Sequence, residues 1–445
     1  MAHSLTAVVL AAGKGTRMKS GLAKVLHPLA GRSMIGHVLA TAAKLEPENA
    51  AVVLSNGMGD VEDEVAKAAI PTATAIQDPP LGTGHALMAA RDRLPTEGDV
   101  LVLYGDTPLL TAGTLMQLLA ERRKENAAVA VFGFRPEDPS GYGRLRFDEG
   151  GLAELVEERH ADEDLKREGL CNAGIMAMDA ARLDTLLDSL ELKQPKGEYY
   201  LTDIVEHARN RGWNCTAIEG PAEEGHGVNS QSQLAEAEAV VQRRLRQAAM
   251  EQGVIMPAPE TVHLAADTEL APGVMIEPNV VFGPKVRVAE QAVIRSFSHL
   301  EGAEVGAGAI IGPYARLRPG SVIGDGARVG NFVETKNTVM DQGAKANHLT
   351  YLGDAHIGSK SNIGAGTITC NYDGFGKHRT EIGKGVFIGS NTALIAPVTV
   401  DDGAIVGAGS TITNDVGSDD LAVARGRQQN IKEGAARFKA GRSKG

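Results

Sequence analysis

Hydrophobic residues follow two different patterns along the 445-residue chain. In the first half they form short unbroken runs, such as LTAVVLAA at 5–12 and DVLVLY at 99–104. Runs of this length predict strands buried on both faces. In the second half an aliphatic residue returns every six positions. Neither the 3.6-residue period of a helix nor the two-residue period of a strand explains that spacing.

The six-residue period is sustained over three long runs in the second half. Glycine often follows the aliphatic position, a pattern typical of a parallel β-helix built from hexapeptides. Three hexapeptides would form one coil, and roughly eight or nine coils fit this segment. The runs are Ile276, Phe282, Val288, Ile294 and Leu300; Val305, Ile311, Leu317, Ile323 and Val329; and Ile382, Ile388, Leu394, Val400, Val406 and Ile412.

A single long helix is expected between the two patterns, over residues 230–252. Ser230 and Gln233 provide a capping box at its start, and Gly253 provides a stop. The predicted organisation is a first domain at 1–229, a helical linker at 230–250 and a second domain at 251–445. The expected apolar face of the helix contains Leu234, Ala237, Val241, Leu245 and Ala248.

Composition narrows the class of protein. The net charge of −11 argues against a general nucleic-acid or membrane-surface binder, because such proteins rely on positive fields. Three cysteines without C-x-x-C spacing indicate neither a disulfide framework nor a zinc site. No signal peptide or membrane span is indicated. We therefore expect a cytoplasmic protein without nucleic-acid or membrane partners.

A glycine-rich loop, AAGKGTRM at 11–18, follows the first predicted strand. Glycines let a backbone approach a ligand closely, and basic side chains offset phosphate charge. The loop is neither a Walker A motif nor G-x-G-x-x-G, and a solvated charge cluster is the alternative interpretation. Six basic residues precede Glu46, the first acidic residue: Lys14, Arg17, Lys19, Lys24, Arg32 and Lys44.

Asp106 follows the second apolar run, at the carboxyl end of a predicted strand. Ligands gather at the carboxyl ends of strands in open α/β sheets, so this carboxylate is expected to face a site. An aspartate here could also simply cap the next helix.

The front half as a whole resembles the nucleotidyltransferases that join sugar 1-phosphates to nucleoside triphosphates. The loop 11–18 with Lys24 carries the first part of that resemblance. Further matches are LGTGHA at 81–86, VLVLYGDTPLL at 100–110, GYGR at 141–144, LVE at 155–157, NAGIM at 172–176, GEYYLTD at 197–203 and GVNS at 227–230. The resemblance implies a Rossmann-like domain in which a sugar phosphate attacks the α-phosphorus of UTP.

The resemblance also implies roles for individual residues. Mg²⁺ would be held by Asp106 and Asn229, and Arg17 and Lys24 would act as catalytic cations. The implied nucleotide- and sugar-binding residues are Leu10, Ala11, Ala12, Gly13, Lys24, Gln77, Gly82, Thr83, Tyr104, Gly105, Asp106, Gly141, Glu157, Asn172 and Asn229.

Two polar segments, KANHLTYLGDAHIG at 345–358 and CNYDGFGKHRT at 370–380, interrupt the hexapeptide rhythm. Interruptions in solenoids commonly mark binding loops. With them, the whole chain resembles the bacterial bifunctional N-acetylglucosamine-1-phosphate uridyltransferases and glucosamine-1-phosphate N-acetyltransferases. That family makes UDP-N-acetylglucosamine for peptidoglycan and lipopolysaccharide synthesis. Its second domain is a left-handed parallel β-helix, and its members are homotrimers.

For the second reaction, the resemblance implies acetyl transfer from acetyl-CoA to glucosamine 1-phosphate, with His348 as general base. Its product, N-acetylglucosamine 1-phosphate, is the substrate of the uridylyl site. The substrate residues would be Arg318, Lys336, Tyr351 and Asn362. The acetyl-CoA residues would be Ala365, Asn371, Tyr372, Ser390, Ala408 and Arg425.

Two alternatives for the coil, and one question about the C-terminal stretch, stay open. The coil could be a scaffold for assembly alone. It could instead hold zinc through histidines shared across a trimer interface, as β-helix carbonic anhydrases do, with His299, His348, His356 and His378 as the available ligands. The basic C-terminal stretch from residue 430 could be a disordered tail or a cover for the coenzyme phosphates.

Overall fold

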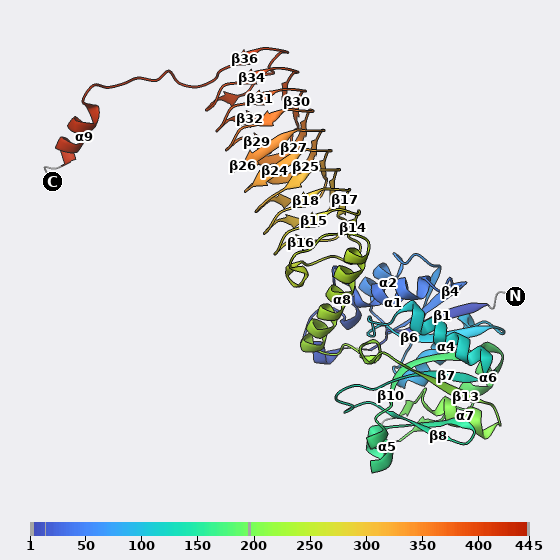
Figure 1. Ribbon diagram of the computed structural model, residues 1–445. Coiled ribbons are helices and arrows are strands. Elements are labelled where there is room, and N and C mark those ends of the chain that lie inside the picture. The colour runs from blue at the N-terminus through green and yellow to red at the C-terminus, as the bar shows by residue number, and fades with distance from the viewer. Residues whose placement is uncertain (1–3, 14, 195–196, 443–445) are drawn as a thin grey trace. The chain divides into compact units, whose positions relative to one another are not determined.

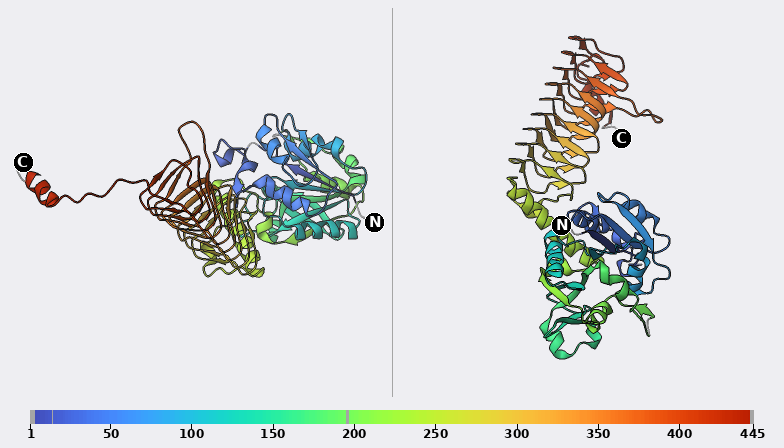
Figure 2. Two further views of the ribbon diagram at one scale, coloured as in Figure 1. Left: turned by 90° about the horizontal axis from the view of Figure 1, so that it is seen from above. Right: turned by 90° about the vertical axis from the view of Figure 1, so that its right-hand side faces the viewer.

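The computed structural model describes residues 4–13, 15–194 and 197–442, so Lys14 lies outside the described residues. The chain divides into two compact units, Met1–Arg244 and Leu245–Gly445. Figures 1 and 2 show a mixed α/β unit and a stack of short strands. No described helix is both long enough and apolar enough to cross a membrane.

A single mixed sheet organises the first unit. Strand β1 (Leu5–Leu10) lies parallel to both β4 (Asn49–Leu54) and β6 (Asp99–Tyr104), whereas β10 (Cys171–Asp179) runs antiparallel to β6 and to β7 (Val129–Phe134). β8 (Arg144–Asp148) pairs with β10 and β9 (Gly151–Val156). The main strand order is β13 (Cys215–Gly220), β7 (Val129–Phe134), β10 (Cys171–Asp179), β6 (Asp99–Tyr104), β1 (Leu5–Leu10), β4 (Asn49–Leu54) and β5 (Thr72–Ile76).

Both faces of this sheet are covered, which explains why its central strands are apolar throughout. Ala7 and Val9 belong to one core, and Val8 and Leu10 belong to the other. Residues of α1 (Met34–Ala43), α2 (Gly59–Val65) and α4 (Ala112–Lys124) join the first core. Residues of α3 (Gly82–Ala89), α6 (Ala180–Leu187) and α7 (Asp203–Asn210) join the second. The smaller elements are β2 (Pro28–Leu29), β3 (Arg32–Ser33), α5 (Glu163–Glu168), β11 (Leu192–Lys193) and β12 (Glu198–Tyr199).

The second unit is a parallel coil of short strands, visible in Figure 1 as stacked rungs. Val281 pairs with His299, and Ile276 with Ile294, so each strand contacts the strand three hexapeptides later. The strands are β14 (Glu269–Leu270), β15 (Met275–Ile276), β16 (Val281–Phe282), β17 (Arg287–Val288), β18 (Val293–Ile294), β19 (His299–Leu300), β20 (Ala303–Val305), β21 (Ile310–Ile311), β22 (Arg316–Leu317), β23 (Ser321–Ile323), β24 (Arg328–Asn331), β25 (Glu334–Met340), β26 (Lys345–His348), β27 (Tyr351–Ile357), β28 (Asn362–Ile363), β29 (Ile368–Cys370), β30 (Thr380–Ile382), β31 (Phe387–Ile388), β32 (Ala393–Ile395), β33 (Val398–Val400), β34 (Ile405–Val406), β35 (Thr411–Ile412) and β36 (Leu421–Ala422).

The hydrophobic period predicted the core of this coil correctly. Every residue of the three six-residue runs is buried and belongs to one continuous core. A second buried residue often lies two positions before the aliphatic one, as Val280 does before Phe282 and Val286 before Val288. The fold class of an α/β unit followed by a parallel β-helix is therefore confirmed.

The coil remains in register on both sides of the interruption at 371–379. Before it, Tyr351 of β27 pairs with Ile368 of β29. After it, Ala355 of the same β27 pairs with Thr380 of β30. The intervening segment folds back on itself through an antiparallel bridge between Tyr372 and Lys377. It is an inserted arm that leaves the stacking of the strands unchanged.

The connecting helix α8 (Gln231–Glu251) spans the boundary between the units. Its first half belongs to the first unit, where Ala237 and Val241 are buried. Its second half packs Leu245 on the core of the coil. Ala248, which was expected on the apolar face, is exposed, because Ala249 takes the contact with the coil instead. A last helix, α9, covers Gly434–Arg442.

One corner of the coil carries a column of large, exposed apolar side chains. Phe297 stacks on Tyr314 with ring centres 4.9 Å apart, and Tyr314 stacks on Phe332 at 5.3 Å. Leu349 continues the column, since its N–H bonds to Asn331, the neighbour of Phe332. All four residues have a positive φ, which is uncommon for side chains of this size. We call these four residues the aromatic column.

Candidate active sites

The first unit contains a cavity of about 510 Å³ at the carboxyl ends of β1 and β6. It brings together most of the nucleotide- and sugar-binding residues expected from the sequence. Those that line it are Leu10, Ala11, Ala12, Gly13, Lys24, Gln77, Gly82, Thr83, Tyr104, Asp106 and Glu157. The other four, Gly105, Gly141, Asn172 and Asn229, lie outside its lining, and so does Arg17, one of the two expected catalytic cations.

Two oxygen atoms converge on the ammonium group of Lys24. The Asp106 carboxylate forms an ion pair with it, and the amide oxygen of Asn229 lies 3.1 Å away. The Arg17 guanidinium donates to the same Asn229 oxygen at 2.8 Å. A carboxylate and an amide oxygen are hard ligands of the kind Mg²⁺ prefers, and a cationic group already joins them here. This donor set fits a magnesium ion completed by substrate phosphates.

The glycine-rich loop is shaped around Lys24. Gly15 has φ of 61°, and a Cβ atom there would lie 2.4 Å from the Cβ of Lys24. At the end of β6, Gly105 donates its N–H to Leu10 at 3.0 Å, and a Cβ atom there would press on Val25 and Ala11. Glycine is therefore required at position 15, where a side chain would meet Lys24, and it relieves crowding at position 105.

The start of α8 holds Asn229 in place. The Asn229 backbone N–H donates to the side-chain oxygen of Gln233 at 2.8 Å, and the Ser230 hydroxyl accepts the N–H of Gln233. The predicted capping box thus differs in one bond, because Gln233 reaches Asn229 rather than Ser230. Next to it, the Val228 N–H donates to the backbone oxygen of Asp106 at 2.8 Å.

Local hydrogen bonds fix the side of the cavity opposite the loop. Gln77 is buried and donates to the carbonyl of Gly82 at 2.8 Å, and the Thr83 hydroxyl accepts the N–H of Leu201. Burial, followed by the negative charge of Asp106, raises the pKa of Tyr104. The Tyr104 hydroxyl therefore stays protonated and can donate to a substrate oxygen.

Asn172 and Gly141 lie where β10 and the loop before β8 leave the regular sheet. Asn172 accepts the N–H of Gly174 at 2.8 Å, beside a register shift between β10 and β7. Gly141 has φ of 84° and donates to Glu158 at 2.7 Å.

The cavity also contains side chains that sequence reasoning did not select. Glu198, Tyr200 and Thr202 line it, and all three belong to the motif GEYYLTD. The motif itself could have indicated these three residues, because they are every second residue of it and would share one face of an extended segment. Sequence reasoning found the motif but assigned no residue in it to the site.

In the second unit, five of the expected acetyltransferase residues share one corner of the coil, beyond the aromatic column. Backbone hydrogen bonds connect successive coils at this corner. The N–H of Gly366 donates to the carbonyl of Leu349, the residue after His348, and the N–H of Asn391 donates to the carbonyl of Ala365. Gly409 then bonds to Ser390, and Arg425 donates to the carbonyl of Ala408 at 2.6 Å. The five residues at this corner are His348, Ala365, Ser390, Ala408 and Arg425.

His348 has one defined partner. Its Nδ1 lies 2.7 Å from the side-chain oxygen of Asn331, 17 residues earlier on the preceding coil. An amide oxygen only accepts hydrogen bonds, so this contact requires a proton on Nδ1, and in the neutral ring Nε2 is then the nitrogen that can accept a proton. Both residues line a cavity of about 300 Å³. Sequence reasoning missed Asn331, because a strict period of three hexapeptides points to Gly330, whereas this coil is one residue shorter and pairs Asn331 with His348.

Positive side chains gather on the next corner. The cations of Lys377 and then Arg318 lower the pKa of Lys336, so the three side chains repel one another and favour an anion between them. Arg318 also pairs with Glu334 at 2.9 Å. Lys377 belongs to the inserted arm and was not selected from the sequence.

The other expected residues lie around these cations. Tyr351 packs over Gly353, where a Cβ atom would lie 2.4 Å from the tyrosine oxygen. Asn371 donates to Asp354 at 2.5 Å, and Tyr372 is exposed at the base of the arm. Asn362 lies apart from them, on the side of the coil formed by β26, β28 and β31.

The histidines considered as zinc ligands occupy separate surroundings within one chain. His356 lies between Asp341 and Glu381, at 3.1 and 3.3 Å, and His378 contacts Asp373 at 2.7 Å. Across the residues that the structure describes, no three His, Cys, Asp or Glu side chains are arranged to hold a metal ion.

The fold and the two sites define a nucleotidyltransferase unit joined to a hexapeptide-coil transferase unit. Residues 7–168 match the family model of the MobA-like NTP transferase domain, and residues 302–337 and 379–414 match the bacterial transferase hexapeptide model. Comparison with curated relatives identifies the family within this class of transferases. The bifunctional protein GlmU of Paramagnetospirillum magneticum is 53% identical to this chain, over 98% of this chain and 97% of its own length.

Two further relatives carry the same name. The bifunctional protein GlmU of Azorhizobium caulinodans is 54% identical over 99% of both chains. That of Zymomonas mobilis is 47% identical over 99% of this chain and 98% of its own length. The chain belongs to the family of bifunctional GlmU proteins.

Proposed function

We propose that this protein makes UDP-N-acetylglucosamine in two steps, one in each unit. The second unit transfers acetyl from acetyl-CoA to glucosamine 1-phosphate, and the first transfers uridylyl from UTP to the N-acetylglucosamine 1-phosphate produced. The observation that carries the proposal is the convergence of Lys24, Asp106 and Asn229 beside the 510 Å³ cavity. Family membership over the whole chain supports pairing this site with an acetyl-transfer site.

In uridylyl transfer, a phosphate oxygen of the sugar attacks the α-phosphorus of UTP, and pyrophosphate leaves. Both reactants are anions, so Arg17 and Lys24 would offset their repulsion and the charge on the leaving group. When bound by Asp106 and Asn229, Mg²⁺ would neutralise phosphate charge and help to align the two reactants. The protonated Tyr104 hydroxyl would donate to the sugar side of the cavity.

In acetyl transfer, the amine nitrogen of glucosamine 1-phosphate attacks the thioester carbonyl, and coenzyme A leaves as the thiol. The lone pair on Nε2 of His348 accepts the amine proton, and Asn331 holds the ring in the required tautomer. Arg318, Lys336 and Lys377 would bind the sugar phosphate. The corner from Ala365 to Arg425 would bind acetyl-CoA.

We further propose that the chain forms a homotrimer through the β-helix and works in the cytoplasm. The aromatic column supports the first point, because exposed apolar side chains gather there beside His348. The three free cysteines suit a reducing compartment such as the cytoplasm.

One experiment tests both activities. The full chain is incubated with glucosamine 1-phosphate, acetyl-CoA, UTP and Mg²⁺, while free thiol and pyrophosphate are followed together. Pyrophosphate should appear only after thiol, since the second step consumes the product of the first. Pyrophosphate release without acetyl-CoA, or thiol release without the amino sugar, would contradict the proposal.

A further inference from the structure

One edge of the 510 Å³ cavity is built around a buried arginine. Arg144, the first residue of β8, is only 2% exposed. Its backbone pairs with Val156 of β9 on one side and with Cys171 of β10 on the other. The residues that follow these two partners in the sequence are Glu157 and Asn172. Arg144 therefore lies between the two chain segments that carry these expected site residues.

The guanidinium of Arg144 has few partners inside the protein. It donates to the carbonyl of Tyr142, and its Nη2 lies 3.8 Å from a carboxylate oxygen of Glu158. Its Nε is buried and has no hydrogen-bond partner among the described residues. An unpaired charge is costly when it is buried, so Arg144 depends on the negative charge of Glu158.

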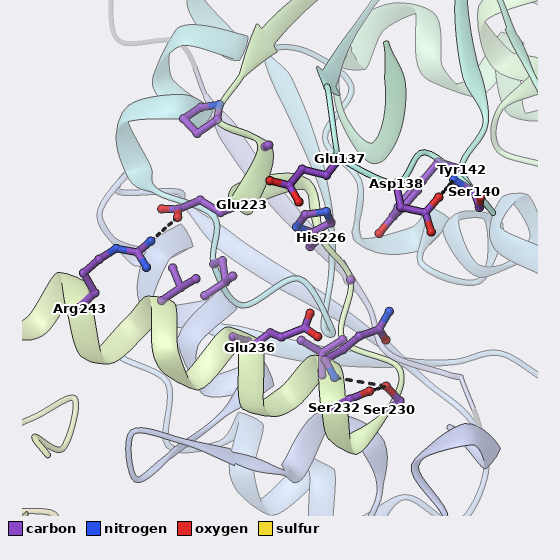
Figure 3. Close-up of a pocket in the computed structure, with 18 residues that line it drawn as sticks. Glu137, Asp138, Ser140, Tyr142, Glu223, His226, Ser230, Ser232, Glu236 and Arg243 are labelled. Carbon is purple, nitrogen blue, oxygen red and sulfur yellow. Dashed lines mark hydrogen bonds and ion pairs between the residues drawn. The ribbon is translucent and has the colours of Figure 1, made fainter. Parts of the chain in front are cut away.

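The second oxygen of Glu158 holds the turn that precedes β8. It accepts the backbone N–H of Gly141 at 2.7 Å. Figure 3 shows part of this turn, where Asp138, Ser140 and Tyr142 lie close together, and the Ser140 N–H donates to Asp138 at 3.0 Å. A single glutamate thus joins the buried arginine to the backbone of the turn.

The other end of the turn contacts the strand that carries Asn172. The Asn172 N–H donates to the carbonyl of Gly143 at 2.9 Å, and the Asn172 side chain accepts the N–H of Gly174 at 2.8 Å. Glu157 lines the cavity and directly precedes Glu158 in the sequence. The contacts of Arg144, Glu158 and Gly143 therefore link three separate segments at one edge of the cavity.

We propose that Arg144 and Glu158 are positioning residues that set the sugar-binding edge of this cavity. The inference rests on the proposed uridylyl transfer. The Glu157 carboxylate repels phosphate groups but accepts hydrogen bonds from the hydroxyl and amide groups of a sugar. The bond from Gly141 to Glu158 fixes the turn relative to Glu157, so this edge is preorganised before the sugar phosphate binds.

This role predicts that the two substrates of uridylyl transfer respond differently. The KM for N-acetylglucosamine 1-phosphate should rise at least about fivefold in Glu158→Ala, whereas the KM for UTP should change less than about twofold. Glu158→Gln should lie between, because its amide oxygen still accepts the Gly141 N–H but the charge facing Arg144 is lost. Glu168→Ala, at an exposed glutamate of α5, is the matched control. Equal changes in both KM values, or no change in either, overturn the proposal.

Hydrogen exchange tests the same contact without measuring activity. Millisecond amide exchange of residues 139–143 should be at least about threefold faster in Glu158→Ala and unaltered in Glu168→Ala. An unchanged exchange rate in the Glu158 variant overturns the proposal. Exchange that is equally accelerated in β1 also overturns it, because the glutamate would then serve the stability of the whole unit. If the unaltered chain does not transfer uridylyl, the proposed function fails while the exchange result still stands.

Discussion

The side-chain oxygen of Asn229 accepts a hydrogen bond from Arg17, although 212 residues separate the two in the sequence. Lys24 reaches the same oxygen and also pairs with Asp106. The position of the Asn229 amide therefore affects Arg17 and Lys24 directly, and it affects the Asp106 carboxylate through Lys24.

Replacement of Asp106 by alanine should reduce uridylyl transfer by at least about a hundredfold, because Lys24 loses its ion-pair partner and the proposed Mg²⁺ would lose its carboxylate ligand. Asn229→Ala should act in the same direction but less strongly. Acetyl transfer by the same preparations is the control and should not change. Near-normal uridylyl transfer by the Asp106 variant would contradict its proposed role, and the alternative of a helix cap is already excluded because Thr111 caps α4.

Gly15→Ala tests the shape of the loop. The new Cβ would meet the Cβ of Lys24 at 2.4 Å, in a backbone conformation that side chains avoid. Uridylyl transfer should fall more than about tenfold, since relief of the clash displaces Lys24 or the loop. Gly21→Ala, where a Cβ meets nothing within 4 Å, should keep its activity. Equal rates for the two variants would show that the loop adapts.

His348→Ala should reduce the kcat of acetyl transfer by roughly 10²–10⁴-fold, the usual effect of losing a general base. Uridylyl transfer should remain unchanged. Asn331→Ala should give a smaller loss, because the ring keeps its lone pair but loses its fixed tautomer. Profiles of kcat against pH would test both roles, with His356→Ala as the control imidazole. A His348 variant within about threefold of normal would rule out the base assignment.

The boundary of an active front fragment should lie within α8. Glu238 accepts the N–H of Ala30 at 2.7 Å, and Arg244 donates to the carbonyl of Leu109 at 2.6 Å. A fragment ending at residue 229 loses these contacts together with Gln233. We expect fragment 1–251 to transfer uridylyl and fragment 1–229 to unfold at lower temperature with little activity. Equal melting temperatures and rates would show that α8 contributes nothing to this unit.

The aromatic column should hold the proposed trimer together. Phe332→Ser and Leu349→Ser remove apolar surface where the subunits are expected to meet, and sedimentation should then show smaller species. Phe387→Ser, which alters an exposed phenylalanine outside the column, is the control. Acetyl transfer should fall with the loss of assembly. Full-size trimers of both column variants would place the interface elsewhere.

The sequence predicted the coil well because its signal is repeated. Each hexapeptide adds evidence for the same buried position, so Ile311 or Val400 could be assigned without knowledge of its neighbours. The contacts at the sites were harder to predict. The bond from Gln233 to Asn229 departs from the usual capping pattern, and the contact of Lys377 with Lys336 depends on the path of the inserted arm.

The arm at 371–379 leaves the coil in register, so its sequence is free of the constraints that govern the strands beneath it. Specificity could therefore diverge among descendants of this protein by change in one surface loop, while the interior remained fixed. The same separation offers engineers a place to graft a new recognition loop. The coil would serve as a scaffold whose strands stay in register whichever loop replaces the arm.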